Sequence, residues 1–237
     1  MVIIAHRQIE NRLRKLGDEA DAEHLQHFFK TGKGEYGEGD RFLGIRVPVL
    51  RKCIPEYRGV ELGETVRLLR SRWHEARLLA LLMLVDRYRR GSPADQREIY
   101  RAYMNNTAHI NNWDLVDLSA QHVVGAHLFE RSRKPLYRLA RSRYLWERRI
   151  SIVSTFHFIG RGEYFESIAL AEVLVGDEHD LIHKAVGWVL REVGKRDLCV
   201  EEEFLRRHHR TMPRTMLRYA IERFPERKRQ AYLKGRM

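Results

Sequence analysis

Apolar residues recur along this chain with the spacing of α-helices, and this pattern restricts the fold more than any other feature. Leu78, Leu79, Leu82 and Val85 share one side of a helix, and the stretch from Ile150 to Ile159 has the same spacing. No stretch alternates between apolar and polar residues as a half-buried strand would. Three prolines stand where helices are expected to begin, in Val47-Pro48, Ser92-Pro93 and Met212-Pro213. We therefore predict an all-α protein.

The expected helices also form a loose internal repeat. Each combines a polar or charged first turn with an apolar continuation, and their starts are about 30 to 40 residues apart, as in HEAT or armadillo repeats. The starts lie near Trp73, Trp113, Trp146, Ile182 and Pro213. Stacked helical hairpins of this kind form a curved solenoid with a concave face. We expect residues 1–237 to form one HEAT-like solenoid domain whose helix starts line a groove, and a globular helical bundle is the alternative.

The charge balance points to a polyanionic partner. Lys and Arg number 44 against 32 Asp and Glu, which gives a formal net charge of +12. Nucleic acid is the first expectation and an anionic membrane surface the second, beside the plain alternative of a basic protein without such a partner. The predicted groove is therefore expected to be positively charged.

The cysteines and the hydropathy pattern favour a cytoplasmic protein. Cys53 and Cys199 stand far apart, without the spacing of a zinc site or a disulfide framework. The longest apolar run, Leu78 to Val85, is too short to cross a membrane, and Met1 to Ala5 is too short for the core of a signal peptide.

Two segments look like ligand-binding motifs but lack the features that such sites need. Gly32 to Gly37 matches the dinucleotide-binding pattern G-x-G-x-x-G, but a helical stretch precedes it and nearby acidic residues would repel a pyrophosphate. An interhelical loop is the better interpretation. The histidine pairs His208-His209 and His24 with His27 lack the further ligands that a metal site needs. We expect no metal and no cofactor.

Trp113 and Asp117 form the most informative pair in the chain. They stand four residues apart, so a helix would place the indole and the carboxylate on one face. A carboxylate is unfavourable where a basic protein meets a polyanion, unless it takes part in chemistry. Other repeats supply residues of complementary use, namely Arg148, Arg149, Lys184 and Trp188. Each has a structural alternative: Trp188 as core filler, Arg149 as a surface arginine, Asp117 as a salt-bridge partner.

These segments resemble the bacterial AlkD family of DNA alkylation-repair glycosylases, which are HEAT-like solenoids. The resemblance rests on W-x-x-x-D at Trp113, W-x-x-R at Trp146 and K-A-x-G-W-x-L-R-E at Lys184. Phe42 to Pro48 and Leu217 to Glu222 extend it to about residues 10 to 230.

The resemblance implies a glycosylase that hydrolyses the N-glycosidic bond of N3- and N7-alkylpurines and leaves an abasic site. It places the catalytic aspartate at Asp117, the paired tryptophans at Trp113 and Trp188, and the active-site arginine at Arg149. Asp117 would stabilise oxocarbenium character on the deoxyribose, and the tryptophans would cradle the sugar. Arg149 would grip the adjacent phosphate and keep Asp117 ionised.

The expected partner is duplex DNA with alkylated purines, bound by a monomer through its phosphates. The residues expected to contact DNA are Arg46, Arg51, Arg148, Lys184, Arg214 and Arg218. The resemblance implies contact with the lesioned backbone on a concave surface rather than a tight base pocket.

Two features depart from the family pattern. The loop from Gly32 to Asp40 is longer and richer in glycine, and Phe28 and Phe29 stand where a tyrosine hydroxyl would be expected. Two alternatives to a glycosylase remain: a non-catalytic HEAT-repeat protein that binds distorted or branched DNA, and a protein-protein scaffold.

Overall fold

The computed structural model describes residues 5–237, and within that range the regular secondary structure is helical. An isolated bridge pairs Arg41 with Trp73, and no strand forms among the described residues. The all-α prediction is therefore confirmed. Met1 to Ile4 belong to the segment predicted to be too short for the core of a signal peptide, and they lie outside the described residues.

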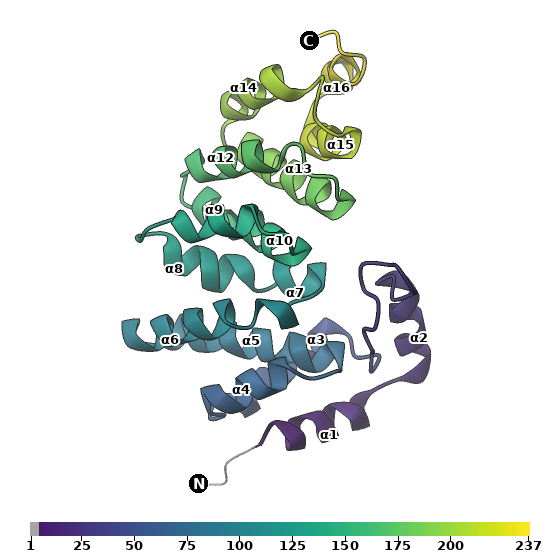
Figure 1. Cartoon of the computed structure of the whole chain (residues 1–237), viewed down its shortest axis with the longest axis vertical. Coiled ribbons are helices and arrows are strands. Elements are labelled where there is room, and N and C mark those ends of the chain that lie inside the picture. The colour runs from purple at the N-terminus through teal and green to yellow at the C-terminus, as the bar shows by residue number, and fades with distance from the viewer. Residues whose placement is uncertain (1–4) are drawn as a thin grey trace. The chain divides into compact units, whose positions relative to one another are not determined.

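The chain divides into two compact units, Met1–Ser119 and Ala120–Met237. The helices of the first unit, drawn in purple to teal in Figure 1, are α1 (His6–Leu16), α2 (Glu19–Phe28), α3 (Val47–Cys53), α4 (Leu62–Leu69), α5 (His74–Arg90), α6 (Pro93–Met104) and α7 (Trp113–Asp117), with 3-10 turns η1 (Ile54–Tyr57) and η2 (Thr107–His109). Helix α5 is the centre of this unit: it packs against α1, α3, α4, α6 and α7. From His74 to Val85 it is buried on all sides, as expected for a helix segment that is surrounded by other helices.

The second unit begins with a π-helical turn, η3 (Gln121–Gly125). Its helices are α8 (Ala126–Leu128), α9 (Lys134–Ala140), α10 (Leu145–Ser154), α11 (Phe156–Ile159), α12 (Phe165–Leu174), α13 (Asp180–Gly194), α14 (Leu198–His208), α15 (Arg214–Ala220) and α16 (Glu226–Leu233), with the 3-10 turn η4 (Ile221–Arg223). Helix α13 is the centre here and packs against α10, α12, α14 and α15 (Figure 1). At Gly187 an added Cβ would lie 2.5 Å from the carbonyl oxygen of Met216, so α13 and α15 pack with their backbones close together.

The predicted helix starts are confirmed to within two residues, because α5, α7, α10, α13 and α15 begin at His74, Trp113, Leu145, Asp180 and Arg214. The spacing of apolar residues also predicts a helix from Ile150 to Ile159. The structure instead breaks this stretch at Thr155 into α10 and α11. The hydroxyl of Ser154 donates to the carbonyl of Ile150, and that of Thr155 to the carbonyl of Ile152. Such bonds back to the preceding turn bend helices, and apolar spacing does not reveal them.

The same hydrogen-bonded start occurs on α5 in the first unit and on α10 in the second. The Ser71 hydroxyl accepts from the amide of Trp73, and the Arg77 guanidinium donates to the Ser71 carbonyl at 3.0 Å. Around α10, Ser142 accepts from Tyr144, and Arg148 donates to the Ser142 carbonyl at 3.1 Å. This match pairs Trp73 with Tyr144 rather than with Trp146.

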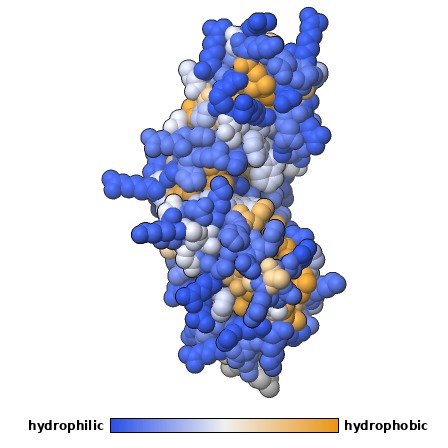
Figure 2. All heavy atoms as spheres, turned by 90° about the vertical axis from the view of Figure 1, so that its right-hand side faces the viewer, coloured by the Kyte–Doolittle hydropathy of each residue, from blue (hydrophilic) through white to orange (hydrophobic). Residues whose placement is uncertain are grey.

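The surface is mostly hydrophilic, with apolar side chains gathered in places over the first unit, the lower half of Figure 2. The exposed large apolar side chains of that unit include Leu16, Phe28 and Val49. Among the described residues, no helix is both long and apolar enough to span a bilayer.

Candidate active site

Trp113 and Asp117 are the first and last residues of the one-turn helix α7, so the predicted shared face exists. Both residues are half-buried. Asn112 caps the helix, because its side-chain oxygen accepts a hydrogen bond from the amide of Trp113 at 2.8 Å. The structure therefore presents an indole and a carboxylate from one short, capped turn.

Two phenylalanines at the end of α2 hold the indole of Trp113. The ring of Phe29 stacks on it with centroids 5.1 Å apart, and the ring of Phe28 meets it edge-on at 6.0 Å. Phe28 is 56% exposed, so this aromatic group reaches the surface. The stack fixes the orientation of the indole, because a large aromatic ring has few alternative positions between such neighbours.

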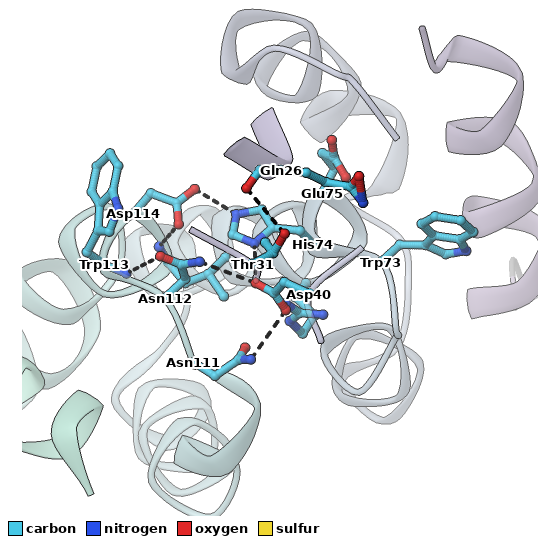
Figure 3. A network of polar contacts seen from close by, with 12 residues as sticks. Gln26, Thr31, Asp40, Trp73, His74, Glu75, Asn111, Asn112, Trp113 and Asp114 are labelled. Atoms are coloured by element: carbon cyan, nitrogen blue, oxygen red, sulfur yellow. Dashed lines mark hydrogen bonds and ion pairs between the residues drawn. The ribbon is translucent and has the colours of Figure 1, made fainter. Parts of the chain in front are cut away.

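A buried polar network anchors α7 to the rest of the first unit (Figure 3). The imidazole of His74 lies between two carboxylates: Nε2 is 2.8 Å from Asp114 and Nδ1 is 3.1 Å from Asp40. Arg77, one turn along α5, donates a hydrogen bond to the other oxygen of Asp40. The side-chain amides of Asn111 and Asn112 also donate to Asp40, each at 3.3 Å.

The network contains charges that balance each other in the interior. Burial alone lowers the pKa of His74, but Asp114 and Asp40 more than offset this and raise it to about 9. His74 is therefore an imidazolium at neutral pH. The pKa of Asp40 is lowered, because its bonds to His74 and Arg77 outweigh the effect of burial. Two cations thus face two carboxylates, a balance that buried ionised groups require.

The glycine-rich loop leads into this network. The loop follows helix α2 and not a strand. A dinucleotide-binding loop follows a strand, so the prediction that this loop joins helices is confirmed. The carboxylates of Glu35 and Glu38 accept hydrogen bonds from the amides of Gly32 and Gly34, the groups that a pyrophosphate would need. The loop ends at Asp40, which lies among the polar side chains around His74.

The segment after Asp40 is held by Glu75. This buried carboxylate accepts hydrogen bonds from the amides of Leu43, Gly44 and Ile45, at 2.8, 2.8 and 3.2 Å. Gly44 has a φ of +80°, and an added Cβ would lie 2.0 Å from the carbonyl oxygen of Asp18. The glycine of the Phe42 to Pro48 motif is therefore required for both conformation and space.

A cavity of about 260 Å³ lies beside this network in the first unit. Its walls are mostly apolar and come from α2, α3, α5, α7 and the segments next to α2 and α3. They contain Leu25, Phe28, Phe29, Phe42, Ile45, Arg46, Val47, Pro48, His74, Glu75, Leu78 and Asp114. His74, Glu75 and Asp114 already bond to other protein groups. The cavity therefore offers a ligand mainly apolar contacts and few hydrogen bonds.

The second unit holds the other predicted catalytic residues. Arg149 on α10 is 5% exposed, and its guanidinium donates to the carbonyl of Leu181 in the first turn of α13 at 2.6 Å. Trp188 on α13 is half-buried and packs against Phe156, with ring centroids 4.4 Å apart. The structure thus gathers the four predicted catalytic residues as two sets, one in each unit.

The predicted phosphate contacts differ in how firmly the protein holds them. Arg51 and Arg218 are exposed, on α3 and α15. Arg46 is exposed but bonds to Asp21, Lys184 pairs with Asp180 one turn away at 2.6 Å, and Arg214 donates to the carbonyl of Leu233.

Arg148 is the most constrained of this set. Its Nε lies 2.6 Å from a carboxylate oxygen of Asp177, and its terminal nitrogen donates to backbone carbonyls, including that of Ser142. These bonds give it a structural role at the start of α10.

The group formed by Asp40, His74, Arg77 and Asp114 was not predicted from the sequence. One signal was available, because His74, Glu75 and Arg77 are charged residues that directly precede the apolar run from Leu78 to Val85. The carboxylates that bond to His74, those of Asp40 and Asp114, lie 34 and 40 residues from it in the sequence. Among the described residues, no group of three or more His, Cys, Asp or Glu side chains is placed to hold a metal ion.

Comparison with known proteins finds a matching family model and similar solved structures. The model of a family described as "DNA alkylation repair enzyme" matches residues 9–224. A solved structure named as a predicted DNA alkylation repair enzyme from Enterococcus faecalis has a similar fold, with a TM-score of 0.68 and 15% sequence identity. The similarity covers 89% of this chain and 97% of that chain. No curated protein matches the sequence.

Proposed function

Since the chain belongs to the DNA alkylation repair enzyme family, we propose that it is a monofunctional DNA glycosylase which releases N3- and N7-alkylated purines from duplex DNA. One observation carries this proposal: α7 presents the indole of Trp113 and the carboxylate of Asp117 from one turn, in a protein of net charge +12. A carboxylate placed where a polyanion binds can stabilise positive charge that develops on the bound molecule. The sugar left by a departing alkylpurine acquires such a charge.

The proposed reaction uses the charge already on the lesion. Alkylation at N3 or N7 makes the purine cationic, so its C1′–N bond breaks without a general acid and the bonding electrons neutralise the base. Positive charge then develops on the deoxyribose. The carboxylate of Asp117 stabilises this charge more in the transition state than in the ground state, which is the condition for catalysis. Water adds to C1′ and gives its proton to the carboxylate, leaving an abasic site.

The tryptophans and cations have supporting roles in this proposal. The face of Trp113 attracts the cationic sugar, an interaction of about 0.5 to 2 kcal/mol, while Phe29 keeps the indole in place. We assign Trp188 to contact the DNA backbone from the second unit. Arg149 is buried and bonds to the first turn of α13. We therefore propose that its main role is to support that turn and that contact with a phosphate is secondary.

The duplex is proposed to bind a monomer through its phosphates. Arg51 and Arg218 are the most available of the predicted contacts, because they are exposed on α3 and α15. HEAT-like repeats with a basic concave groove remain a prediction. The recurring start of α5 and α10 supports the repeat. The satisfied polar groups around the cavity support recognition without a hydrogen-bonding base pocket.

The test is release of methylated purines from methylated duplex under single-turnover conditions. Asp117→Asn should slow release at least about 10²-fold, the effect typical of losing one preorganised electrostatic group. Glu98→Gln is the matched control, because it removes one exposed carboxylate from α6 and should keep the wild-type rate.

Three results would contradict the proposal. Full activity of Asp117→Asn would remove the carboxylate from the mechanism. Strand cleavage without added alkali would indicate a lyase. Tight, salt-sensitive duplex binding without any base release would identify the chain as a non-catalytic DNA-binding protein.

A further inference from the structure

Helix α7 cannot fix its own direction. It has five residues, and its backbone bonds include those from Val116 to Asn112 and from Leu118 to Asp114. A single turn is too short to be stable alone, because nucleation costs more than so few hydrogen bonds return. The position of Trp113 and Asp117 therefore depends on what holds the turn from outside.

The polar residues around the start of α7 reach one buried site. Asp114 bonds to Nε2 of His74, while Asn111 and Asn112 bond to Asp40, which in turn bonds to Nδ1 of the same imidazole. Figure 3 shows the imidazole between the two carboxylates, with Trp113 on the far side of Asp114. His74 thus joins α5, α7 and the end of the glycine-rich loop.

The geometry requires a charged imidazole. Both ring nitrogens lie within 3.1 Å of carboxylate oxygens, and only the doubly protonated ring can donate to two acceptors at once. The other charged groups at the site are Arg77, which bonds to Asp40, and Glu75, which holds the backbone from Leu43 to Ile45. The side chain of His74 is 2% exposed, so water does not replace these bonds.

We propose that His74 is a positioning residue which, through its hydrogen bonds to Asp114 and Asp40, sets the direction of α7 and so aims Asp117 and Trp113 at the lesion. This rests on the proposed function, because it assumes that Asp117 acts on the sugar. The side chain of His74 is almost completely buried, so we propose that it acts through Asp114 and Asp40 and not through contact with the substrate. A displacement of about 1 Å at a reacting group costs about 10²-fold in rate, so a loosened turn is expected to reduce activity strongly.

The first experiment is a double-mutant cycle with His74→Gln, Asp114→Asn and the double variant. His74→Gln should lower the single-turnover rate of base release between about 10-fold and about 10²-fold. Its affinity for methylated duplex should stay within about threefold of wild type, since phosphate contacts dominate binding. The double variant should lose little more than the worse single variant, because both changes remove the same contact.

Leu13→Ala is the control for general loss of stability. Leu13 is fully buried on α1, which packs against α4 and α5, so its truncation weakens the core of the same unit without removing a bond to α7. Below its melting temperature, this variant should keep the wild-type rate.

The second experiment measures hydrogen exchange and does not depend on activity. In His74→Gln the amides of residues 111–118 should lose protection by at least about tenfold, while those of α4 and α6 keep theirs. If the wild type releases no base, the proposed function fails, and this exchange pattern alone decides the role of His74.

Several outcomes would overturn the inference. A folded His74→Gln with the wild-type rate would do so, and so would additive losses in the cycle. Unchanged protection of residues 111–118 would show that His74 does not hold the turn. An even loss of protection across the first unit would make His74 a residue of the core only.

Discussion

Raising the pH should remove a specific part of the stability of the first unit, through deprotonation of His74. Burial on its own lowers the pKa of this imidazole, but the carboxylates of Asp114 and Asp40 more than offset this and raise it to about 9. In the unfolded chain a histidine has a pKa of about 6.5. The folded protein therefore holds this proton over a range of pH in which the unfolded chain has already released it.

The sign and size of the effect follow from that difference. The stability that the proton contributes is fully present below about pH 6.5 and is lost as the pH rises through about 9. The two pKa values differ by about 2.5 units, and each unit corresponds to about 1.36 kcal/mol, so the loss is about 3 kcal/mol.

The assay is urea denaturation of the wild type and His74→Gln from about pH 6 to about pH 10. The difference between the two free energies of unfolding isolates His74, because other groups titrate in both proteins. Glu201 is one of these, since burial raises its pKa to about 8. The wild type should exceed the variant by about 3 kcal/mol more at the low end than at the high end. An NMR titration of the His74 ring should have its midpoint near 9.

Parallel stability curves for the two proteins would refute the reasoning. They would mean that the proton on His74 is bound equally in the folded and unfolded states. A ring that titrates near pH 6.5 would contradict the charged network for the same reason.

The remaining predictions concern a pair of glycines and a pair of arginines. Gly187→Ala should lower the free energy of unfolding by about 1 to 3 kcal/mol, because its Cβ would lie 2.5 Å from Met216 O and from Tyr219 Cβ. Gly63→Ala, on α4 with open space around the added Cβ, should instead raise it by about 0.5 to 1 kcal/mol, and equal effects in urea denaturation would contradict this. Arg51→Ala should weaken duplex binding for all sequences and reduce the slope of log affinity against log salt by about 1. Arg148→Ala should leave that slope nearly unchanged. It should lower the free energy of unfolding by about 3 kcal/mol, because it removes the ion-pair partner of the mostly buried carboxylate of Asp177. A change of slope would instead show that Arg148 contacts DNA.

Much of the fold was predictable because helices are local. Apolar spacing and prolines placed the starts of α5, α7, α10, α13 and α15 within two residues. The break at Thr155 was not predictable in this way, since it depends on hydroxyl groups that bond back to the preceding turn. The hydrogen-bonded start that α5 and α10 share was not predictable either, because it depends on bonds from Arg77 and Arg148 to the carbonyls of Ser71 and Ser142.

Some features of the candidate site could likewise be predicted from the sequence, and others could not. Trp113 and Asp117 could be paired from sequence, because four residues on a helix span about one turn. The contacts of Arg148 could not be foreseen. An arginine fork suits a phosphate and a carboxylate equally well, and only the structure shows Asp177 beside it.

The sequence by itself determined that the chain is helical and basic, that it matches a DNA alkylation repair family, and that one turn carries an indole and a carboxylate. Helicity, charge and the shared face of the turn depend on composition and on neighbours within a few residues, whereas the family match extends over residues 9–224. Only the tertiary structure decided what holds that turn. His74 meets Asp40 and Asp114 across 34 and 40 residues, and no local pattern encodes such a distance. The interior strengthens these pairings because water is excluded there, so packing decides which charges stay ionised and which groups bond to the turn that carries Asp117.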